Sequence, residues 1–216
     1  YGSGEEAAAD AAAFALPGDD SLTAIDYSDV CLNIDDAWFA EAGIAPPATL
    51  EDLAKPEYRE LAVVPAATTS SPGLAFLLAT VAAFGEDGWQ GYWRSLVENG
   101  VKVVPGWSDA YYTDFTVGGG GDRPIVLSYA SSPPFTVPEG GEEPTTSALL
   151  ETCFRQVEYA GVLAGAKNPE GAKAVLDLLL SAEFQAGIAE SMYVYPVSSA
   201  VELPAEWVRW APLAEQ

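Results

Sequence analysis

The sequence predicts an α/β protein, and three observations lead to this fold class. Segments rich in β-branched and aromatic residues alternate with helix-forming segments along the 216 residues. Apolar residues make up 49% of the chain, which is enough for a packed core. No apolar run approaches the roughly 20 residues that a membrane-spanning helix needs. We therefore expect a globular fold with helices packed on a sheet.

The expected elements follow from residue periodicity and from turn residues. Strands are expected at 25–34, 61–65, 101–104, 125–129 and 153–161. Helices are expected at 5–14, 37–42, 74–84, 88–99, 168–180 and 181–190, with Phe184 and Ile188 facing inward in the last one. Thr49 is the expected N-cap of a further helix, with Asp52 at the capping-box position. Segments rich in Gly, Pro and acidic residues are expected loops at 16–20, 118–122 and 133–146.

The charge balance excludes several functions. The chain has 32 acidic and 9 basic residues, a formal net charge of −23, and no histidine. Such a chain repels nucleic acids and anionic membrane surfaces. Without histidine the usual catalytic triads and most zinc sites cannot form. We expect no enzyme activity, no cofactor and no metal centre.

A carboxylate-based hydrolase is the enzymatic alternative. It would use a pair of acidic residues such as Asp35 and Asp36. Adjacent residues at a helix start do not face each other, so this pair is poorly arranged for acid and base roles.

Three loops that each follow an expected strand form the candidate binding site, because ligands of open α/β sheets bind at the carboxyl ends of strands. The loop 68–73 offers hydroxyls and helix-start N–H groups to a phosphate, hydroxyl or carboxylate, or is an ordinary N-cap. The loops 105–112 and 128–135 offer rings to a flat or cationic ligand, or these rings pack in the core. The candidates are Ser70, Ser71, Gly73, Trp107, Asp109, Tyr111, Tyr129, Ser131 and Phe135.

Four short motifs in these and a later segment resemble a known family. The motifs are SSPG at 70–73, GWSDAY at 106–111, SYASSP at 128–133 and YPV at 195–197. In this order they resemble the thiamine-binding subunits of bacterial ABC transporters, which are extracellular solute-binding proteins. The resemblance runs from about Ile25 to Leu203.

The resemblance implies a periplasmic-binding-protein-like fold of type II and a thiamine site lined by aromatic rings. Ser70 then matches a residue at the hydroxyethyl or phosphate end of the ligand, and Trp107 and Tyr129 match pocket aromatics. Phe135 stands where the family commonly has Tyr, and Tyr193 where it often has Trp. Asp109 is a candidate carboxylate for the thiazolium cation, or caps a helix.

The resemblance also implies a domain organisation. Residues 1–25 would be a remnant of the first lobe, 26–155 the second lobe with the hinge strands, and 156–216 the C-terminal helices returning to the first lobe. The chain would then lack about the first third of a family member. Thiamine or a thiamine phosphate, and the permease of an ABC importer, are the implied partners. The implied location is the periplasm or the outer face of the cell membrane, with or without a lipid anchor.

Cys31 and Cys153 have no metal-ligand spacing and are either buried thiols or one disulfide. The resemblance places the strands that carry them side by side at the hinge, which makes a disulfide possible.

Two further alternatives remain. Tyr111 and Tyr112 form the kind of tyrosine pair with which related solute-binding proteins hold ferric iron. A structural interaction domain is the third reading, since a missing lobe would leave apolar surface on the C-terminal helices.

Overall fold

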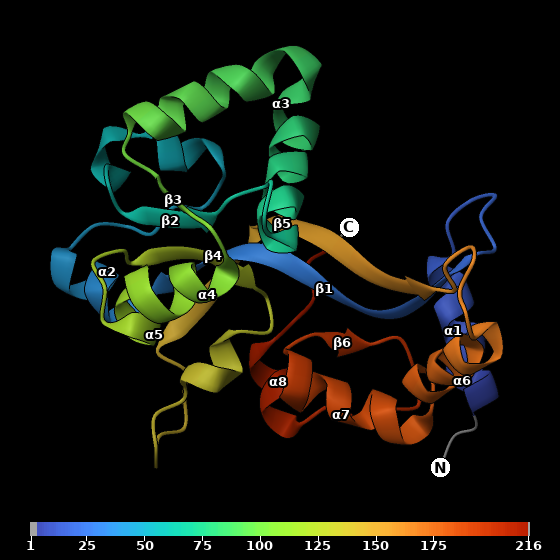
Figure 1. The fold of residues 1–216 in the computed structure, drawn as a ribbon. Helices are drawn as coiled ribbons and strands as arrows, with labels where there is room; N and C mark the ends of the chain where they lie inside the picture. Colours follow the sequence, from blue (N-terminus) through green and yellow to red (C-terminus); the bar gives the residue numbers. More distant parts are fainter. Residues whose placement is uncertain (1–3, 216) are drawn as a thin grey trace. The chain divides into compact units, whose positions relative to one another are not determined.

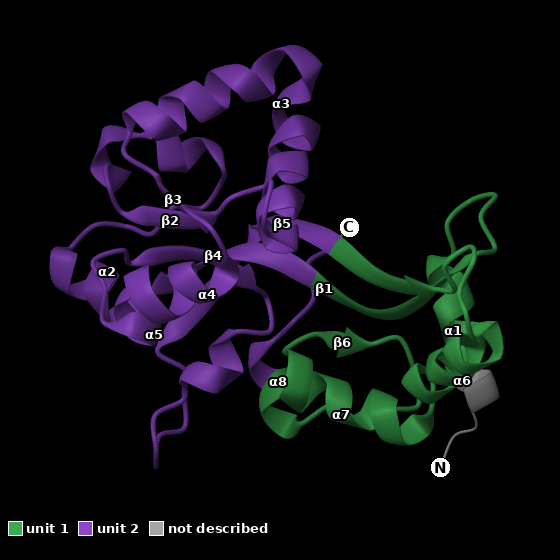
Figure 2. Cartoon of the chain, in the orientation of Figure 1, with its two compact units in different colours: residues 1–28, 156–208 green, residues 29–155, 209–216 purple. Residues whose placement is uncertain are grey.

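The computed structural model describes residues 4–215, which form a mixed α/β fold, as the sequence predicts. The chain divides into two compact units, shown in Figure 2. Unit 1 comprises residues 1–28 and 156–208, and unit 2 comprises 29–155 and 209–216. The lobe boundaries that the resemblance implies stay a prediction. In the described part of the chain, no helix is both long and apolar enough to cross a membrane.

The helices and strands are labelled in Figure 1. The strands are β1 (Leu22–Asp35), β2 (Ala62–Pro65), β3 (Lys102–Val104), β4 (Ile125–Tyr129), β5 (Thr146–Gly161) and β6 (Tyr195–Pro196). The α-helices are α1 (Gly4–Ala11), α2 (Asp36–Ala42), α3 (Ser71–Glu98), α4 (Trp107–Asp109), α5 (Thr116–Gly119), α6 (Pro169–Leu179), α7 (Ala182–Met192) and α8 (Ala205–Trp210). Short 3-10 helices occupy η1 (Ala12–Phe14), η2 (Glu51–Ala54), η3 (Pro56–Tyr58) and η5 (Pro133–Thr136), and η4 (Ala110–Asp114) is a π-helical turn.

The sheet has the strand order β3-β2-β4-β1-β5, with β6 added beside β1. β2 pairs in parallel with both β3 and β4, so these three strands end at the same edge. β1 runs antiparallel to β4, with Cys31 opposite Ser128 and Ile34 opposite Ile125. β1 and β5 each contribute residues to both units.

In unit 2 the sheet is covered on both faces, as the alternation of side chains along its strands requires. Val64 of β2 and Leu127 of β4 face one core together with Phe76 of α3. Their neighbours Val63 and Val126 face a second core, formed with the α4 to α5 segment. The strands that carry the three candidate loops are thus fixed from both sides.

Helix α3 has two arms that meet at Gly85, which has φ 71° and ψ 174° (Figure 1). A left-handed φ of this kind suits glycine, because a Cβ would be strained there. The two arms correspond to the separate helices expected at 74–84 and 88–99.

Three local expectations were wrong. Thr49 does not begin an α-helix, because only the short 3-10 helix η2 follows it, although Asp52 does accept the N–H of Thr49 at 3.1 Å. Phe184 does not face inward, since 37% of it is exposed, whereas Ile188 is buried. The strand expected at 153–161 begins earlier, at Thr146, because its residues pair with β1 despite a weak alternation of apolar residues.

Several cross-strand contacts join β1 to β5 in unit 2. Cys31 and Cys153 form a disulfide with their Cα atoms 4.2 Å apart. Asp29 is fully buried and forms an ion pair with Arg155, whose Nη2 donates to Asp29 Oδ2 at 3.0 Å. The N–H of Ala214 donates to the same oxygen at 2.8 Å, which fixes the C-terminal segment of unit 2. This buried carboxylate thus receives the hydrogen bonds that its burial demands.

Unit 1 has a small core of its own around Ala24, Ile25 and Leu180. Gln185 of α7 is buried and donates to the carbonyl of Ile25 at 3.0 Å, while its Oε1 accepts the N–H of Ser198 at 3.1 Å. One amide side chain thereby links β1, α7 and the segment after β6.

We predict that removal of the disulfide strongly destabilises the protein. The bridge closes a loop with a sequence separation of 122 residues, so the chain-entropy model gives a loss of about 5 kcal/mol as an upper value. Chemical denaturation of Cys31→Ser/Cys153→Ser should show a midpoint well below that of the oxidised wild type. Equal midpoints would contradict this role.

We predict a pH dependence of stability caused by Asp26 in unit 1. Burial of this carboxyl, and then the negative charge of Glu158, raise its pKa from 3.8 to about 7. Because the folded pKa is raised, the stabilisation is complete below about pH 4 and is lost as the pH rises through 7. In buffer free of divalent cations, urea unfolding of Asp26→Asn should show a flatter profile from pH 4 to 8 and higher stability at pH 8. A profile parallel to that of the wild type would exclude this cause.

Candidate functional site

The three candidate loops lie at one edge of the sheet in unit 2. They follow β2, β3 and β4, and the parallel pairing of these neighbours brings their carboxyl ends together. Such an edge is where ligands bind in open α/β sheets. The geometry therefore groups the loops as the sequence predicts.

Hydrogen bonds join the three loops to one another. Thr69 Oγ1 in the first loop donates to the carbonyl of Pro105 in the second at 2.6 Å. Trp107 Nε1 in the second loop donates to Ser128 Oγ at the end of β4 at 2.9 Å. Thr69 and Ser128 were not among the candidate site residues. Both lie within the candidate loops 68–73 and 128–135, and Ser128 also begins the SYASSP motif.

A cluster of aromatic rings surrounds Trp107. The ring of Tyr111 stacks on it at 4.9 Å and 18°, and Tyr112 meets it edge-on at 5.2 Å. Tyr129 lies 6.3 Å away at a tilt of 41°. Phe115, fully buried, packs against Tyr111 at 5.5 Å and anchors the cluster in the core. The cluster thus ranges from the buried Phe115 and Tyr111 to the exposed Tyr112.

The orientation of Trp107 is fixed by a chain of hydroxyls. Ser128 Oγ, which accepts from the indole, lies 2.7 Å from Ser132 Oγ. Ser132 Oγ also accepts the N–H of Tyr129 at 3.2 Å. Both serines are buried, so these bonds are protected from competition by water. These hydroxyls connect the indole of Trp107 to the backbone N–H of Tyr129.

The first loop presents a helix start. Ser70 is the N-cap of α3, but its side chain makes no capping hydrogen bond. The Ser70 hydroxyl is therefore not an ordinary helix cap. Ser71 is exposed as the first residue of the helix, whereas Gly73 is buried. A Cβ on Gly73 would lie 2.4 Å from the carbonyl oxygen of Pro65, so this glycine permits the helix to approach β2.

The other candidates differ in their accessibility. Asp109 is exposed in α4 and does not cap that helix. Phe135 is 42% exposed in η5, whereas Ser131 is fully buried. Tyr193 has a left-handed φ of 62° at the end of α7 and belongs to unit 1, while the other candidates belong to unit 2.

Asp35 and Asp36 have separate structural contacts. Asp35 caps α2 by accepting the N–H of Trp38 at 3.0 Å, and it also accepts from Thr116 Oγ1 at 2.6 Å. Asp36 accepts from Ser147 Oγ at 2.8 Å. Burial raises the pKa of Asp36, and the bond from Ser147 opposes that shift. These contacts give both carboxylates a role in folding. Among residues 4–215, no group of three or more His, Cys, Asp or Glu side chains is arranged to hold a metal ion.

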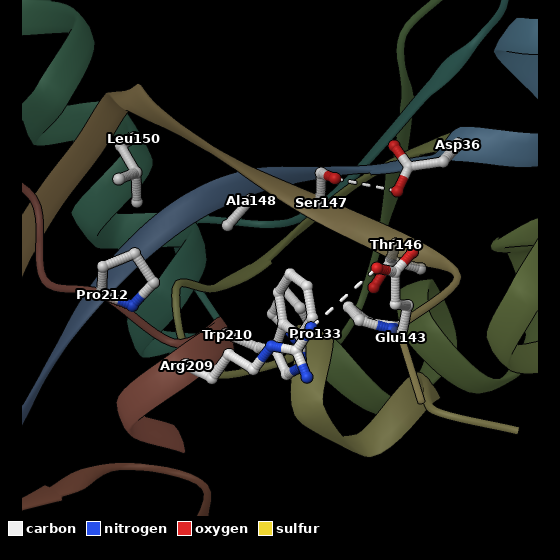
Figure 3. A pocket seen from close by; sticks show the side chains of 11 residues that line it. Asp36, Pro133, Glu143, Thr146, Ser147, Ala148, Leu150, Arg209, Trp210 and Pro212 are labelled. Carbon is white, nitrogen blue, oxygen red and sulfur yellow. Dashed lines mark hydrogen bonds and ion pairs between the residues drawn. The ribbon is translucent and has the colours of Figure 1, made fainter. Parts of the chain in front are cut away.

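Each unit contains a cavity, and the one in unit 2 is lined in part by Pro133 of the third loop. One of about 360 Å³ in unit 2 is lined by Asp36, Glu143, Ser147, Arg209 and Trp210, among others. Figure 3 shows Ser147 directed at Asp36, and the Arg209 guanidinium lies 4.4 Å from the centre of the Trp210 ring. A second cavity of about 440 Å³ in unit 1 contains the stacked rings of Phe14, Tyr27 and Tyr195. The YPV motif at 195–197 lines the cavity in unit 1, and Pro133 of the SYASSP motif lines the one in unit 2.

Comparison with known proteins defines the family. A family model for bacterial extracellular solute-binding proteins matches residues 5–213. The chain belongs to this family. Its fold is that of the type II periplasmic binding proteins, as the solved structures below show.

The individual relatives are thiamine-binding proteins. The chain is 34% identical over 161 residues to the thiamine-binding periplasmic protein of Escherichia coli (strain K12), covering 74% of this chain and 47% of that relative. It is 33% identical over 163 residues to the protein of the same name from Brucella suis biovar 1, with 74% and 47% covered. The chain thus spans about half the length of the curated relatives it matches.

Solved structures agree with this assignment. A periplasmic thiamin binding protein matches with a TM-score of 0.79 and 27% identity, covering 100% of this chain and 66% of that one. A ferric binding protein from Campylobacter jejuni matches with a TM-score of 0.68 and 19% identity, covering 92% and 64%. The latter match shows the shared fold alone.

We predict that Gly73→Ala destabilises unit 2. The new methyl group would collide with the backbone of Pro65 and Ala66, and overpacking of this kind costs about 1–3 kcal/mol. Gly91→Ala on the same helix is the matched control, because its Cβ would meet nothing closer than 3.9 Å. Thermal unfolding should show a lower midpoint for Gly73→Ala only. A drop of equal size in both variants would indicate a general effect on α3.

Proposed function

We propose that the protein is the substrate-binding component of an ABC importer and that it binds thiamine or a thiamine phosphate at the edge formed by the three loops. The carrying observation is the hydrogen-bonded junction of these loops around the Trp107 cluster. Family membership and the names of the relatives support the same ligand. No catalytic step is part of this proposal.

The chemistry of the cluster suits this ligand. Thiamine combines a permanently cationic thiazolium with a flat aminopyrimidine, and both bind well to aromatic faces. Trp107 and Tyr129 would supply the faces, and the exposed Asp109 a carboxylate for the cation. The hydroxyethyl or phosphate end would bind at the start of α3. It would form hydrogen bonds with the Ser70 hydroxyl, which does not cap the helix, and with the N–H groups there.

The remaining candidates have secondary roles in this proposal. Ser71 and Phe135 are exposed and available for contact, and a ligand contact of Tyr193 stays a prediction from the resemblance. Gly73 acts through the approach of α3 to β2. Tyr111 and Ser131 are buried, so we expect them to support neighbouring groups.

Delivery to a membrane permease and a location outside the cytoplasm follow from the family and belong to the proposal. The net charge of −23 favours attraction of a cation, although salt confines this effect to about 8–10 Å from the surface.

Ferric iron is the competing ligand within the same fold. Ferric binding proteins share the fold, but at identities that carry no argument about ligand. The structure also engages Tyr111 in stacking on Trp107 and packing on Phe115, which favours a structural role for its ring. An iron-loaded chain would be coloured by phenolate charge transfer.

We predict that calorimetric titration of the 216-residue chain with thiamine, up to millimolar concentration, shows saturable binding. Trp107→Ala should weaken it about five- to thirtyfold, since loss of a stacked cationic contact costs about 1–2 kcal/mol. Trp89→Ala is the control, because Trp89 is a partly buried tryptophan on α3, away from the three loops.

The outcomes separate function from site. Binding that is unchanged in Trp107→Ala would refute the site while leaving the function. The absence of binding to the wild type would refute the function, and a coloured, saturable complex with ferric iron would replace it.

A further inference from the structure

Four polar side chains gather on one face of the paired ends of β1 and β5 within unit 1, the green ends of these strands in Figure 2. Contacts between the strands pair Asp29 with Arg155 and Cys31 with Cys153, so residue numbers rise along one strand as they fall along the other. The same antiparallel register places Asp26 opposite Glu158, whose negative charge helps to raise the pKa of Asp26. Ser28 then lies opposite Gln156, on the same face.

Three oxygen atoms of this group are buried and unpaired. They are Asp26 Oδ1, Ser28 Oγ and Gln156 Oε1, none of which has a hydrogen-bond partner. Asp26 is 6% exposed and Ser28 1%. Buried polar atoms without partners are rare in folded proteins, because each costs about 1–3 kcal/mol. Three of them on one face of two neighbouring strands therefore need an explanation.

The side chains around these atoms are arranged as oxygen donors. The Gln156 amide donates its Nε2 to Glu158 Oε1 at 2.8 Å, which leaves Oε1 as the free end of that amide. Glu158 itself is exposed and gives the group access to solvent. The group thus offers two carboxylates, one hydroxyl and one amide oxygen, with no cationic side chain among them.

We propose that Asp26, Ser28, Gln156 and Glu158 form a binding site for a hard, oxygen-preferring metal cation, of which Ca²⁺ fits best. Calcium takes six to eight oxygen ligands in flexible geometry from carboxylates, hydroxyls and amide carbonyls. Mg²⁺ demands stricter octahedral geometry and retains its water.

Binding of Ca²⁺ would satisfy the three unpaired oxygens at the same time. With two carboxylates, we expect an affinity of about 10⁻⁴–10⁻³ M, typical of extracellular calcium modules. The site is separate from the thiamine site and does not depend on that proposal.

Calorimetric titration of the whole chain with CaCl₂ at pH 7.5 and constant ionic strength tests the site. We expect one saturable site in the wild type. Glu158→Gln and Asp26→Asn should each weaken binding at least tenfold. Glu158 is exposed, so its substitution should leave the fold intact and gives a test that does not depend on the stability of Asp26→Asn.

Glu151→Gln is the matched control, since Glu151 is also an exposed glutamate on β5. It should bind Ca²⁺ as the wild type does. Equal weakening in Glu151→Gln and Glu158→Gln would show that Ca²⁺ only screens the acidic surface, and would overturn the proposal. The absence of saturable binding up to 10-fold above the expected range, about 10 mM, would also overturn it and leave water as the partner of these oxygens.

Discussion

The parallel pairing of β2 with both β3 and β4 is the constraint on which the candidate site depends. It brings three strand ends to one edge, where Thr69 and Trp107 then bond across the loops that follow. Cores on both faces of the sheet hold these strands in place, so the site rests on a rigid base. The rings around Trp107 are therefore already ordered before a flat ligand binds. This lowers the entropic cost of association.

The long antiparallel strands β1 and β5 are a second structural feature, and β1 pairs directly with β4. A disulfide and the buried pair of Asp29 with Arg155 join them in unit 2, while in unit 1 β1 carries the buried carboxyl of Asp26 and the buried hydroxyl of Ser28. Apolar side chains at these positions would need no hydrogen-bond partner. Buried polar side chains without hydrogen-bond partners at these positions therefore destabilise the protein without a ligand. This cost is consistent with a binding role there.

Much of the fold could be predicted from sequence because its signals are local. The short apolar strands 61–65 and 125–129, and the division between the helices 74–84 and 88–99, are indicated by nearby residues. The start of β5 and the exposure of Phe184 could not be predicted, because pairing with β1 and the packing of α7 decide them.

For the site, the loops were evident from their position after strands. The hydrogen bonds of Thr69 and Ser128, and the unpaired oxygens of Asp26 and Ser28, depend on residues distant in sequence.

The most direct test of the central claim is a crystal structure of the chain grown with saturating thiamine. The account predicts ligand density at the ends of β2, β3 and β4, with a thiamine ring in van der Waals contact with the Trp107 indole, at about 3.5–4 Å. Ordered thiamine in the cavity beside Trp210, with the Trp107 cluster free of ligand, would contradict it.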